Sequence, residues 1–215
     1  MTTRSTLDDP SVKRVLDGMH ADADRVDPPL LARAKGKSLV QRAAVLREAF
    51  IPVSPDAGRF LYALVRAAQP GTVVEFGTSF GVSTIYMAAA LRDRGGGRVV
   101  TTELLPSKAD RARQYIDEAG LSNLVDLRVG DALQTLRGFE RDVALLFLDG
   151  AKDLYVPVLK LLEPALKSGA LVIGDDIDLF PDALATYLRY VRDPANGYVS
   201  VKVPIGDAME LSTRA

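Results

Sequence analysis

Residues 72–103 read TVVEFGTSFGVSTIYMAAALRDRGGGRVVTTE, and this stretch decides the fold of the chain. It opens with a short run of β-branched and apolar residues, 72–76, which is typical of a buried strand. A glycine-containing turn follows, then a helical pattern over 82–93, a glycine loop and a second strand-like run, 98–103. A strand, a helix and a second strand in this order predict two parallel strands joined by a helix that covers the sheet.

The same alternation of strand and helix patterns continues to residue 193. Further strand-like runs lie at 124–129, 143–148 and 170–174. Two alternating runs, YVSVKV and AMELST, then close the chain, and the turn-like PIGD joins them. We therefore expect an α/β fold with a doubly wound, mostly parallel seven-stranded sheet, helices on both faces and a C-terminal antiparallel hairpin.

The segment before residue 70 reads as helical, with two predicted helices at 12–20 and 30–48. The Pro28-Pro29 pair between them predicts a loop. A third helix is expected to begin with Ser54 as its N-cap and Pro55 at its first helical position.

Composition excludes several classes of protein. The 215 residues include 27 basic and 28 acidic side chains, a net charge of -1, so no strong positive field would attract nucleic acid or an anionic membrane. There is no cysteine, which excludes thiolate metal sites. The single histidine, His20, reads as an ordinary, partly exposed helix residue, so catalysis or metal binding by histidine is not expected. Without a long apolar run or a leader-like segment, we expect a cytoplasmic protein that binds a small molecule.

Ligand-binding residues are expected where the predicted parallel strands end. Gly77 and Gly81 follow the first strand, and Ser83 opens the next helix, an arrangement that suits a carboxylate near helix amides. Glu103 ends the second strand, where an acid classically accepts two ribose hydroxyls, and Asp131 follows the third, as an adenine partner or a helix cap. The GxxxG spacing, in place of GxGxxG, favours S-adenosylmethionine over a nicotinamide dinucleotide.

Acidic residues follow the next two strands. Asp149 comes after the fourth strand, and Asp175 and Asp176 follow the fifth. Adjacent strands lie about 4.8 Å apart, so these carboxylates can meet over a hard cation such as Mg²⁺, Mn²⁺ or Ca²⁺. The alternative is that the aspartates only cap the following helices. Lys152 lies beside them, and whether its pKa is lowered by a dication or raised by the acids stays open at this point.

Four segments together carry a family resemblance: SPDAGRFL, EFGTSFGVST, FLDGAKDLY and GALVIGDDIDLF. From about Ile51 to the C-terminus the chain resembles the cation-dependent class I O-methyltransferases, the group of catechol O-methyltransferase and the caffeoyl-coenzyme A O-methyltransferases. The resemblance implies a Rossmann-like methyltransferase domain over 51–215. It also implies a helical extension over 1–50, which would roof the acceptor site or form a homodimer contact.

The resemblance further implies that S-adenosylmethionine is the methyl donor, a catechol-like hydroxyl is the acceptor, Lys152 is the general base and Mg²⁺ is held by Asp149, Asp175 and Asp176. The cofactor-binding residues it implies are Val53, Glu75, Gly77, Thr78, Ser79, Gly81, Ser83, Glu103, Asp131, Ala132 and Asp149.

Two departures from the family pattern bear on this interpretation. The third metal ligand is usually Asn, whereas this chain has Asp176, and the aromatic gates that hold small catechols are not matched, Ala151 being at one such position. Three alternatives therefore stay open: a metal-independent methyltransferase acting on oxygen or nitrogen, a nicotinamide-dependent oxidoreductase, and a non-catalytic binding module.

Overall fold

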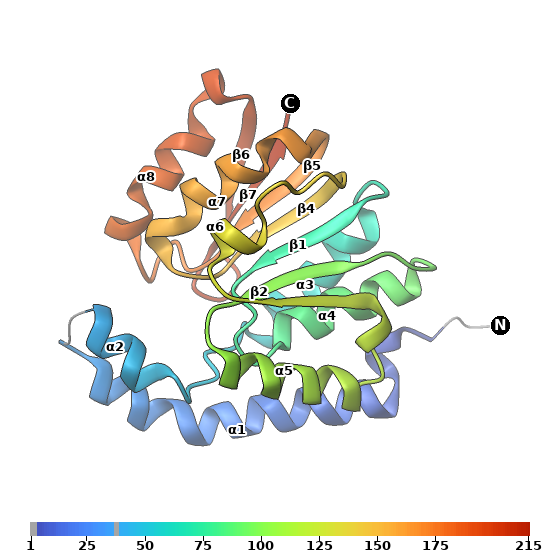
Figure 1. Ribbon diagram of the computed structural model, residues 1–215, viewed down its shortest axis with the longest axis vertical. Helices are drawn as coiled ribbons and strands as arrows, with labels where there is room; N and C mark the ends of the chain where they lie inside the picture. The colour runs from blue at the N-terminus through green and yellow to red at the C-terminus, as the bar shows by residue number, and fades with distance from the viewer. Residues whose placement is uncertain (1–3, 37–38) are drawn as a thin grey trace.

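A computed structural model describes residues 4–36 and 39–215 of the chain. Its centre is a seven-stranded sheet with the strand order β3-β2-β1-β4-β5-β7-β6 (Figure 1). Strands β1 to β5 pair in parallel, and β7 runs antiparallel to both β5 and β6. The predicted fold class and C-terminal hairpin are therefore confirmed. The strands are β1 (Thr72–Phe76), β2 (Val99–Glu103), β3 (Val125–Val129), β4 (Val143–Leu148), β5 (Leu166–Gly174), β6 (Tyr198–Val203) and β7 (Met209–Arg214).

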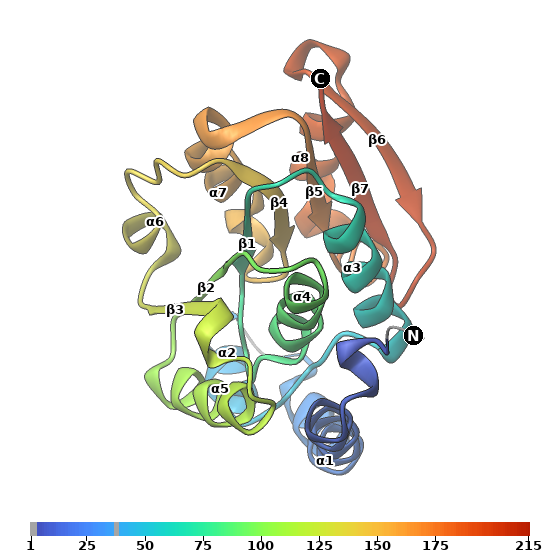
Figure 2. The ribbon, with the colours of Figure 1, turned by 90° about the vertical axis from the view of Figure 1, so that its right-hand side faces the viewer.

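Helices cover both faces of this sheet, because successive strand residues point to opposite sides. Val73 of β1 belongs to a buried cluster with α1, α3, α4 and α5, whereas the next residue, Val74, packs with α7 and α8 (Figures 1 and 2). None of the helices within the described ranges has both the length and the apolar character needed to cross a bilayer. The helices are α1 (Pro10–Ala34), α2 (Leu39–Leu46), α3 (Pro55–Ala67), α4 (Val82–Asp93), α5 (Pro106–Glu118), α6 (Ala132–Thr135), α7 (Tyr155–Leu162) and α8 (Pro181–Arg192).

The direction of winding reverses between β1 and β4. From β1 the chain moves outward to β2 and β3, and it then returns to β4 on the other side of β1. Phe76 of β1 pairs with Leu148 of β4, which in turn pairs with Gly174 of β5. The residues that follow these three strands therefore emerge at one level, which is where ligands bind in open α/β sheets.

The N-terminal region differs from the sequence-based expectation in two respects. The single helix predicted at 30–48 is wrong, because α1 ends at Ala34 and a separate helix, α2, begins at Leu39. The loop predicted at Pro28-Pro29 is wrong, because α1 runs through both prolines as one helix. A proline inside a helix removes a hydrogen bond and strains the preceding turn. Here contacts outside the helix outweigh the cost of the two prolines. Met19 and Ala23 are buried in the core, and Asp27 accepts hydrogen bonds from the chain after α2.

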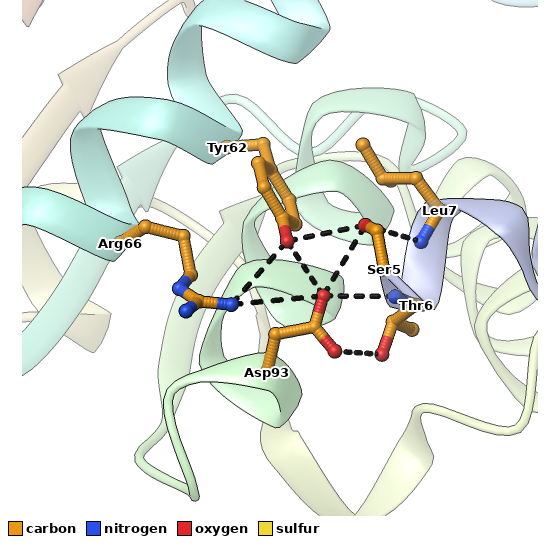
Figure 3. Close-up of polar contacts among 6 residues, drawn as sticks. All are labelled: Ser5, Thr6, Leu7, Tyr62, Arg66 and Asp93. Atoms are coloured by element: carbon orange, nitrogen blue, oxygen red, sulfur yellow. Dashed lines mark hydrogen bonds and ion pairs between the residues drawn. The ribbon is translucent and has the colours of Figure 1, made fainter. Parts of the chain in front are cut away.

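The start of α1 is fastened to the end of α4 by one carboxylate. Asp93 accepts hydrogen bonds from the Thr6 backbone at 2.8 Å, from the Thr6 hydroxyl at 2.5 Å and from the Tyr62 hydroxyl at 2.6 Å (Figure 3). Ser5 contacts both Asp93 and Tyr62, and Arg66 lies 3.9 Å from the carboxylate. The N-terminal helix is thus anchored on the same layer as α3 and α4.

Candidate functional site

Three adjoining cavities follow the carboxyl edge of the sheet. The outer cavity, of about 670 Å³, lies beyond β2 and β3 and is lined by Glu103, Leu104, Asp131 and Leu133 among others. The central cavity, of about 830 Å³, lies beyond β1, and the acidic cavity, of about 450 Å³, lies beyond β4 and β5 under α1. Glu103 lines both the outer and the central cavity, and the central and acidic cavities share Asp149 and Asp176. The three cavities thus adjoin one another along this edge, and together they are called the groove.

Most residues predicted from the sequence line this groove. Those at the outer cavity are Gly77, Glu103, Asp131 and Ala132. Those at the central cavity are Val53, Gly77, Thr78, Ser79, Ser83, Glu103, Asp149, Lys152 and Asp176. Those at the acidic cavity are Val53, Asp149, Asp175 and Asp176. Glu75 and Gly81 line none of the three cavities.

Gly77 is required by the contact between two strand ends. Its φ is +102°, and a Cβ at this position would lie 2.7 Å from the backbone oxygen of Asp149. Only glycine combines this backbone conformation with so close an approach. Gly77 therefore brings the turn after β1 against the loop after β4, and so joins the two halves of the groove.

Glu75 is buried and lines none of the three cavities, but it holds a residue that does. Its carboxylate is fully buried and accepts hydrogen bonds from the hydroxyls of Ser83, Thr84 and Thr101. Burial raises the pKa of Glu75, and these hydroxyls oppose the rise. Since Ser83 lines the central cavity, Glu75 orients a groove residue without itself facing the groove.

Glu103 is held by the turn that follows β1. Its Oε2 accepts from the Ser79 backbone N–H at 2.9 Å, and its Oε1 accepts from the Leu105 N–H at 2.9 Å. Each carboxylate oxygen has a second accepting position, so both can still receive hydrogen bonds from a ligand. Asp131 serves in two ways: it caps α6 through the Leu133 N–H at 2.9 Å and also lines the outer cavity.

Lys152 forms ion pairs with two of the three predicted metal ligands. Its Nζ lies 2.7 Å from Asp176 Oδ2 and 3.3 Å from Asp149 Oδ1, and it donates to the Tyr155 hydroxyl at 2.8 Å. Asp175 Oδ1 instead accepts from the Asp176 backbone N–H at 2.9 Å. Asp149 thus binds a lysine and Asp175 a neighbouring amide, and neither acid caps the helix that follows it, because the N-caps of α7 and α8 are Leu154 and Phe180.

Burial and mutual repulsion set the pKa values in this cluster. Burial, together with Asp175 and Asp176, raises the pKa of Asp149 well above its usual range, although Lys152 opposes the rise. Burial and Asp176 raise the pKa of Asp175 to about 7. Burial lowers the pKa of Lys152, but Asp149 and Asp176 outweigh it, so the net pKa is raised and Lys152 is an ammonium at neutral pH.

The residue types in this cluster suit a hard divalent ion, but their present arrangement does not form a ligand set. Three carboxylates face one ammonium, and this surplus of negative charge and of oxygen donors suits Mg²⁺. Over residues 4–36 and 39–215, however, no three His, Cys, Asp or Glu side chains are grouped so that they could hold a metal ion as they stand. A cation that used Asp149 and Asp176 together would compete with Lys152 for the same carboxylates.

Two buried charged residues at the groove were not predicted from the sequence. Lys108 of α5 lines the central cavity and is 8% exposed, and Asp27 of α1 lines the acidic cavity and is 6% exposed. A signal for Asp27 was present, because it continues the apolar stripe of Val15, Met19 and Ala23 at four-residue spacing. A charge on such a stripe indicates a specific buried partner.

A family model described as "Methyltransferase domain" matches residues 74–177. The chain is 34% identical over 131 residues to a catechol O-methyltransferase of Niastella koreensis, a match that covers 59% of this chain and 58% of that relative. It is 31% identical over 198 residues to catechol O-methyltransferase B of Danio rerio, covering 89% of this chain and 70% of that relative. The match thus spans less than two thirds of the first relative's length.

The fold is also similar to solved structures. One is the O-methyltransferase TomG from Streptomyces achromogenes, determined in complex with SAM. It has a TM-score of 0.64 and 27% sequence identity, and the superposition covers 77% of this chain and 82% of that one.

Proposed function

Because the chain belongs to the class I O-methyltransferase family, we propose that it transfers a methyl group from S-adenosylmethionine to a hydroxyl of a small catechol-like acceptor. The observation that carries this proposal is the row of adjoining cavities that makes up the groove. Glu103 joins the outer cavity to the central one, and Asp149 joins the central cavity to the acidic one. A nucleoside at one end and a reacting oxygen at the other can therefore be bound side by side.

The outer half of the groove suits the adenosine of the cofactor. Leu104 and Leu133 supply apolar walls for a purine, and Asp131 and Ala132 lie beside them. Glu103 has accepting positions left for ribose hydroxyls. The methionine part would extend into the central cavity past Ser83 and the amino end of α4, towards Val53.

The acidic end suits the reacting hydroxyl. Lys152 would take the proton of the acceptor, and the resulting oxyanion would attack the methyl carbon of the sulfonium. An oxygen–carbon bond forms as the carbon–sulfur bond breaks, and S-adenosylhomocysteine leaves as the neutral thioether. Lys152 becomes a base only after its ion pairs with Asp149 and Asp176 are relieved, since both raise its pKa. Because the methyl donor is already activated, most of the acceleration would come from holding the two reactants together, worth on the order of 7 to 11 kcal/mol.

Metal assistance is part of the proposal. Asp149, Asp175 and Asp176 would hold a divalent ion such as Mg²⁺, which when bound supplies positive charge that lowers the pKa of the acceptor hydroxyl. Support comes from the raised pKa values of Asp149 and Asp175, because carboxylates that repel one another in a buried site are stabilised by a cation.

A metal-independent methyltransferase is the second candidate, and one observation favours it. Lys152 already forms ion pairs with Asp149 and Asp176, so an ammonium is in position to attract the acceptor oxygen without an added ion. The two candidates differ in one measurable property, which is the dependence of turnover on a divalent cation.

The N-terminal extension, residues 1–50, would act as the roof of the acceptor site. In support, the acidic cavity is lined by α1 together with Asp149, Asp175 and Asp176, and the α1 residues include Ala23, Asp24, Asp27, Pro28 and Leu31. The remaining residues, 51–215, would form the methyltransferase domain. Formation of a homodimer stays a prediction, which light scattering of the purified chain tests.

The deciding experiment combines binding and turnover. Calorimetry with S-adenosylhomocysteine and with NAD identifies the cofactor, and binding of NAD alone would refute the proposal. Methyl transfer is then measured on catechol, caffeic acid and dopamine, with Mg²⁺ and with EDTA. Activity that EDTA abolishes supports the metal-assisted reaction, and undiminished activity in EDTA supports the metal-independent one. Cofactor binding without turnover on a broad panel of phenols and amines would favour a binding module.

A further inference from the structure

Part of the connection between α2 and α3, residues 49–53, lies along the groove and is called the strap. Phe50, Ile51, Pro52 and Val53 line the central cavity, and Ile51 and Val53 also line the acidic cavity. The strap therefore forms a wall for both the proposed cofactor and the proposed acceptor. Its position decides the shape of the space between them.

Three side chains from three different elements hold the backbone of the strap. Asp27 of α1 accepts from the backbone N–H groups of Phe50 at 2.7 Å and of Ile51 at 2.6 Å. Ser79, in the turn after β1, donates its hydroxyl to the Phe50 carbonyl oxygen at 2.9 Å. Lys108 of α5 donates to the Ala49 carbonyl oxygen at 2.8 Å. Strap amides and carbonyls are thus held from opposite sides.

These three contacts are connected to the proposed ribose site. Lys108 also donates to the Ser79 hydroxyl at 3.1 Å, and the Ser79 backbone N–H binds Glu103. Ser79 therefore touches the strap, Lys108 and Glu103 at once. A shift of the strap would be transmitted to Glu103 through a single residue.

The charged groups of Asp27 and Lys108 form hydrogen bonds with backbone groups of the strap. Both side chains are more than nine-tenths buried, yet neither has an ion-pair partner among the described residues. Placing a charge in the interior is unfavourable unless it is fully hydrogen-bonded. Burial lowers the pKa of Lys108, in keeping with this environment.

The strap needs this support because it contains a strained residue. Ile51 has φ +43°, in the left-handed region that β-branched side chains rarely adopt. Strained backbone persists only where surrounding contacts over-determine it, and it concentrates at ligand clamps. Asp27 accepts one hydrogen bond from the Ile51 N–H itself and one from the Phe50 N–H just before it, so its contacts lie at the strained residue.

We propose that Asp27 and Lys108, acting with Ser79, are positioning residues that fix the strap in its cofactor-binding conformation, so that α1 controls affinity for the methyl donor. The inference rests on the proposed function. It adds that a residue outside the methyltransferase domain, on the N-terminal helix, sets the cofactor affinity through backbone hydrogen bonds.

The test compares variants of the full chain by calorimetry with S-adenosylhomocysteine. Asp27→Ala and Lys108→Met are expected to raise its Kd at least tenfold, and Asp27→Asn, which keeps one accepting oxygen, should fall between Asp27→Ala and the wild type. Asp17→Ala, an exposed acid on the same helix, should bind as the wild type does. In turnover, KM for S-adenosylmethionine should rise tenfold while kcat changes less than threefold, a split that a general loss of folded protein would not give.

Several results would overturn the proposal. One is a folded Asp27→Ala or Lys108→Met protein whose Kd stays within twofold of the wild-type value. If Asp27→Ala does not fold, Lys108→Met decides, and hydrogen exchange of the wild type decides if neither folds. The Phe50 and Ile51 amides should exchange slowly, and still more slowly when S-adenosylhomocysteine is bound. An exchange rate that the ligand does not change would contradict the proposed role of the strap. Failure of the wild type to bind S-adenosylhomocysteine would instead refute the proposed function.

Discussion

The ammonium nitrogen of Lys152 lies 2.7 Å from Oδ2 of Asp176, closer than its 3.3 Å distance to Oδ1 of Asp149. Asp176 is also the position at which the family resemblance implies Asn. Its φ is +64°, a conformation that Asn adopts as readily as Asp. An Asp176→Asn substitution therefore changes one charge and leaves the backbone conformation intact.

We expect Asp176→Asn to weaken the use of Mg²⁺ while improving turnover at saturation. Removing one of three carboxylates should raise the Mg²⁺ concentration for half-maximal activity about tenfold, about 1.4 kcal/mol of binding free energy. With less negative charge nearby, the ion should act more strongly on the acceptor oxygen, and kcat should rise. A Mg²⁺ titration of methyl transfer measures both. Asp178→Asn, an exposed neighbour paired with Lys202, is the control, and identical titrations of Asp176→Asn and wild type would contradict the assignment.

Lys152→Met should separate catalysis from cofactor binding. Loss of a general base costs about 10² to 10⁴ in kcat, whereas the Kd for S-adenosylhomocysteine should stay within twofold of the wild-type value. Asp149→Ala should cost more rate than Lys152→Met. Lys160→Met, on the exposed side of α7, controls for loss of a lysine. A Lys152→Met enzyme that keeps a tenth or more of wild-type kcat would remove Lys152 from the proton transfer.

Much of this site could be predicted because it follows from strand ends. Gly77, Glu103, Asp149 and Asp175 come directly after, or at the end of, four parallel strands, and local sequence patterns locate such ends well. The N-cap at Ser54 followed by Pro55 was likewise a local signal, and the Ser54 side chain does accept from the Ala57 N–H. Patterns that depend on neighbouring residues therefore carried over to the structure.

Features that depend on distant contacts could not be predicted. The α1 helix continues through Pro28 and Pro29 because of packing that the local sequence does not contain. Lys108 looks like any helix-surface lysine until Ala49 and Ser79 are brought to it from elsewhere in the chain. Whether Lys152 gains or loses basicity also depended on the distances to its acids.

Gly77→Ala should disturb both stability and the catalytic loop. The positive φ alone costs about 1 to 3 kcal/mol for a residue with a Cβ, and here the Cβ would also strike the backbone of Asp149. Gly138→Ala is a matched control, since Gly138 has φ +67° but no atom within 4 Å of its Cβ position. Thermal unfolding should show a larger fall in Tm for Gly77→Ala, and kcat should fall only there. Equal Tm changes in the two variants would show that the approach of β1 and β4 imposes no constraint.

Asp93→Asn should reduce stability in a pH-dependent way. Burial raises the pKa of Asp93, but hydrogen bonds from Thr6 and Tyr62 lower it more, so the folded-state pKa lies below the ordinary aspartate value of 3.8. The carboxylate therefore adds stability that is complete above about pH 4 and is lost as pH falls through the folded-state pKa. Replacing its charged hydrogen bonds should cost about 2 kcal/mol and several degrees of Tm at neutral pH.

The Tm difference between wild type and Asp93→Asn, followed by circular dichroism, should stay constant from pH 8 to pH 5 and shrink below pH 4. A difference that grew on acidification would mean that Asp93 is protonated in the folded protein and that charged hydrogen bonds do not hold the contacts shown in Figure 3.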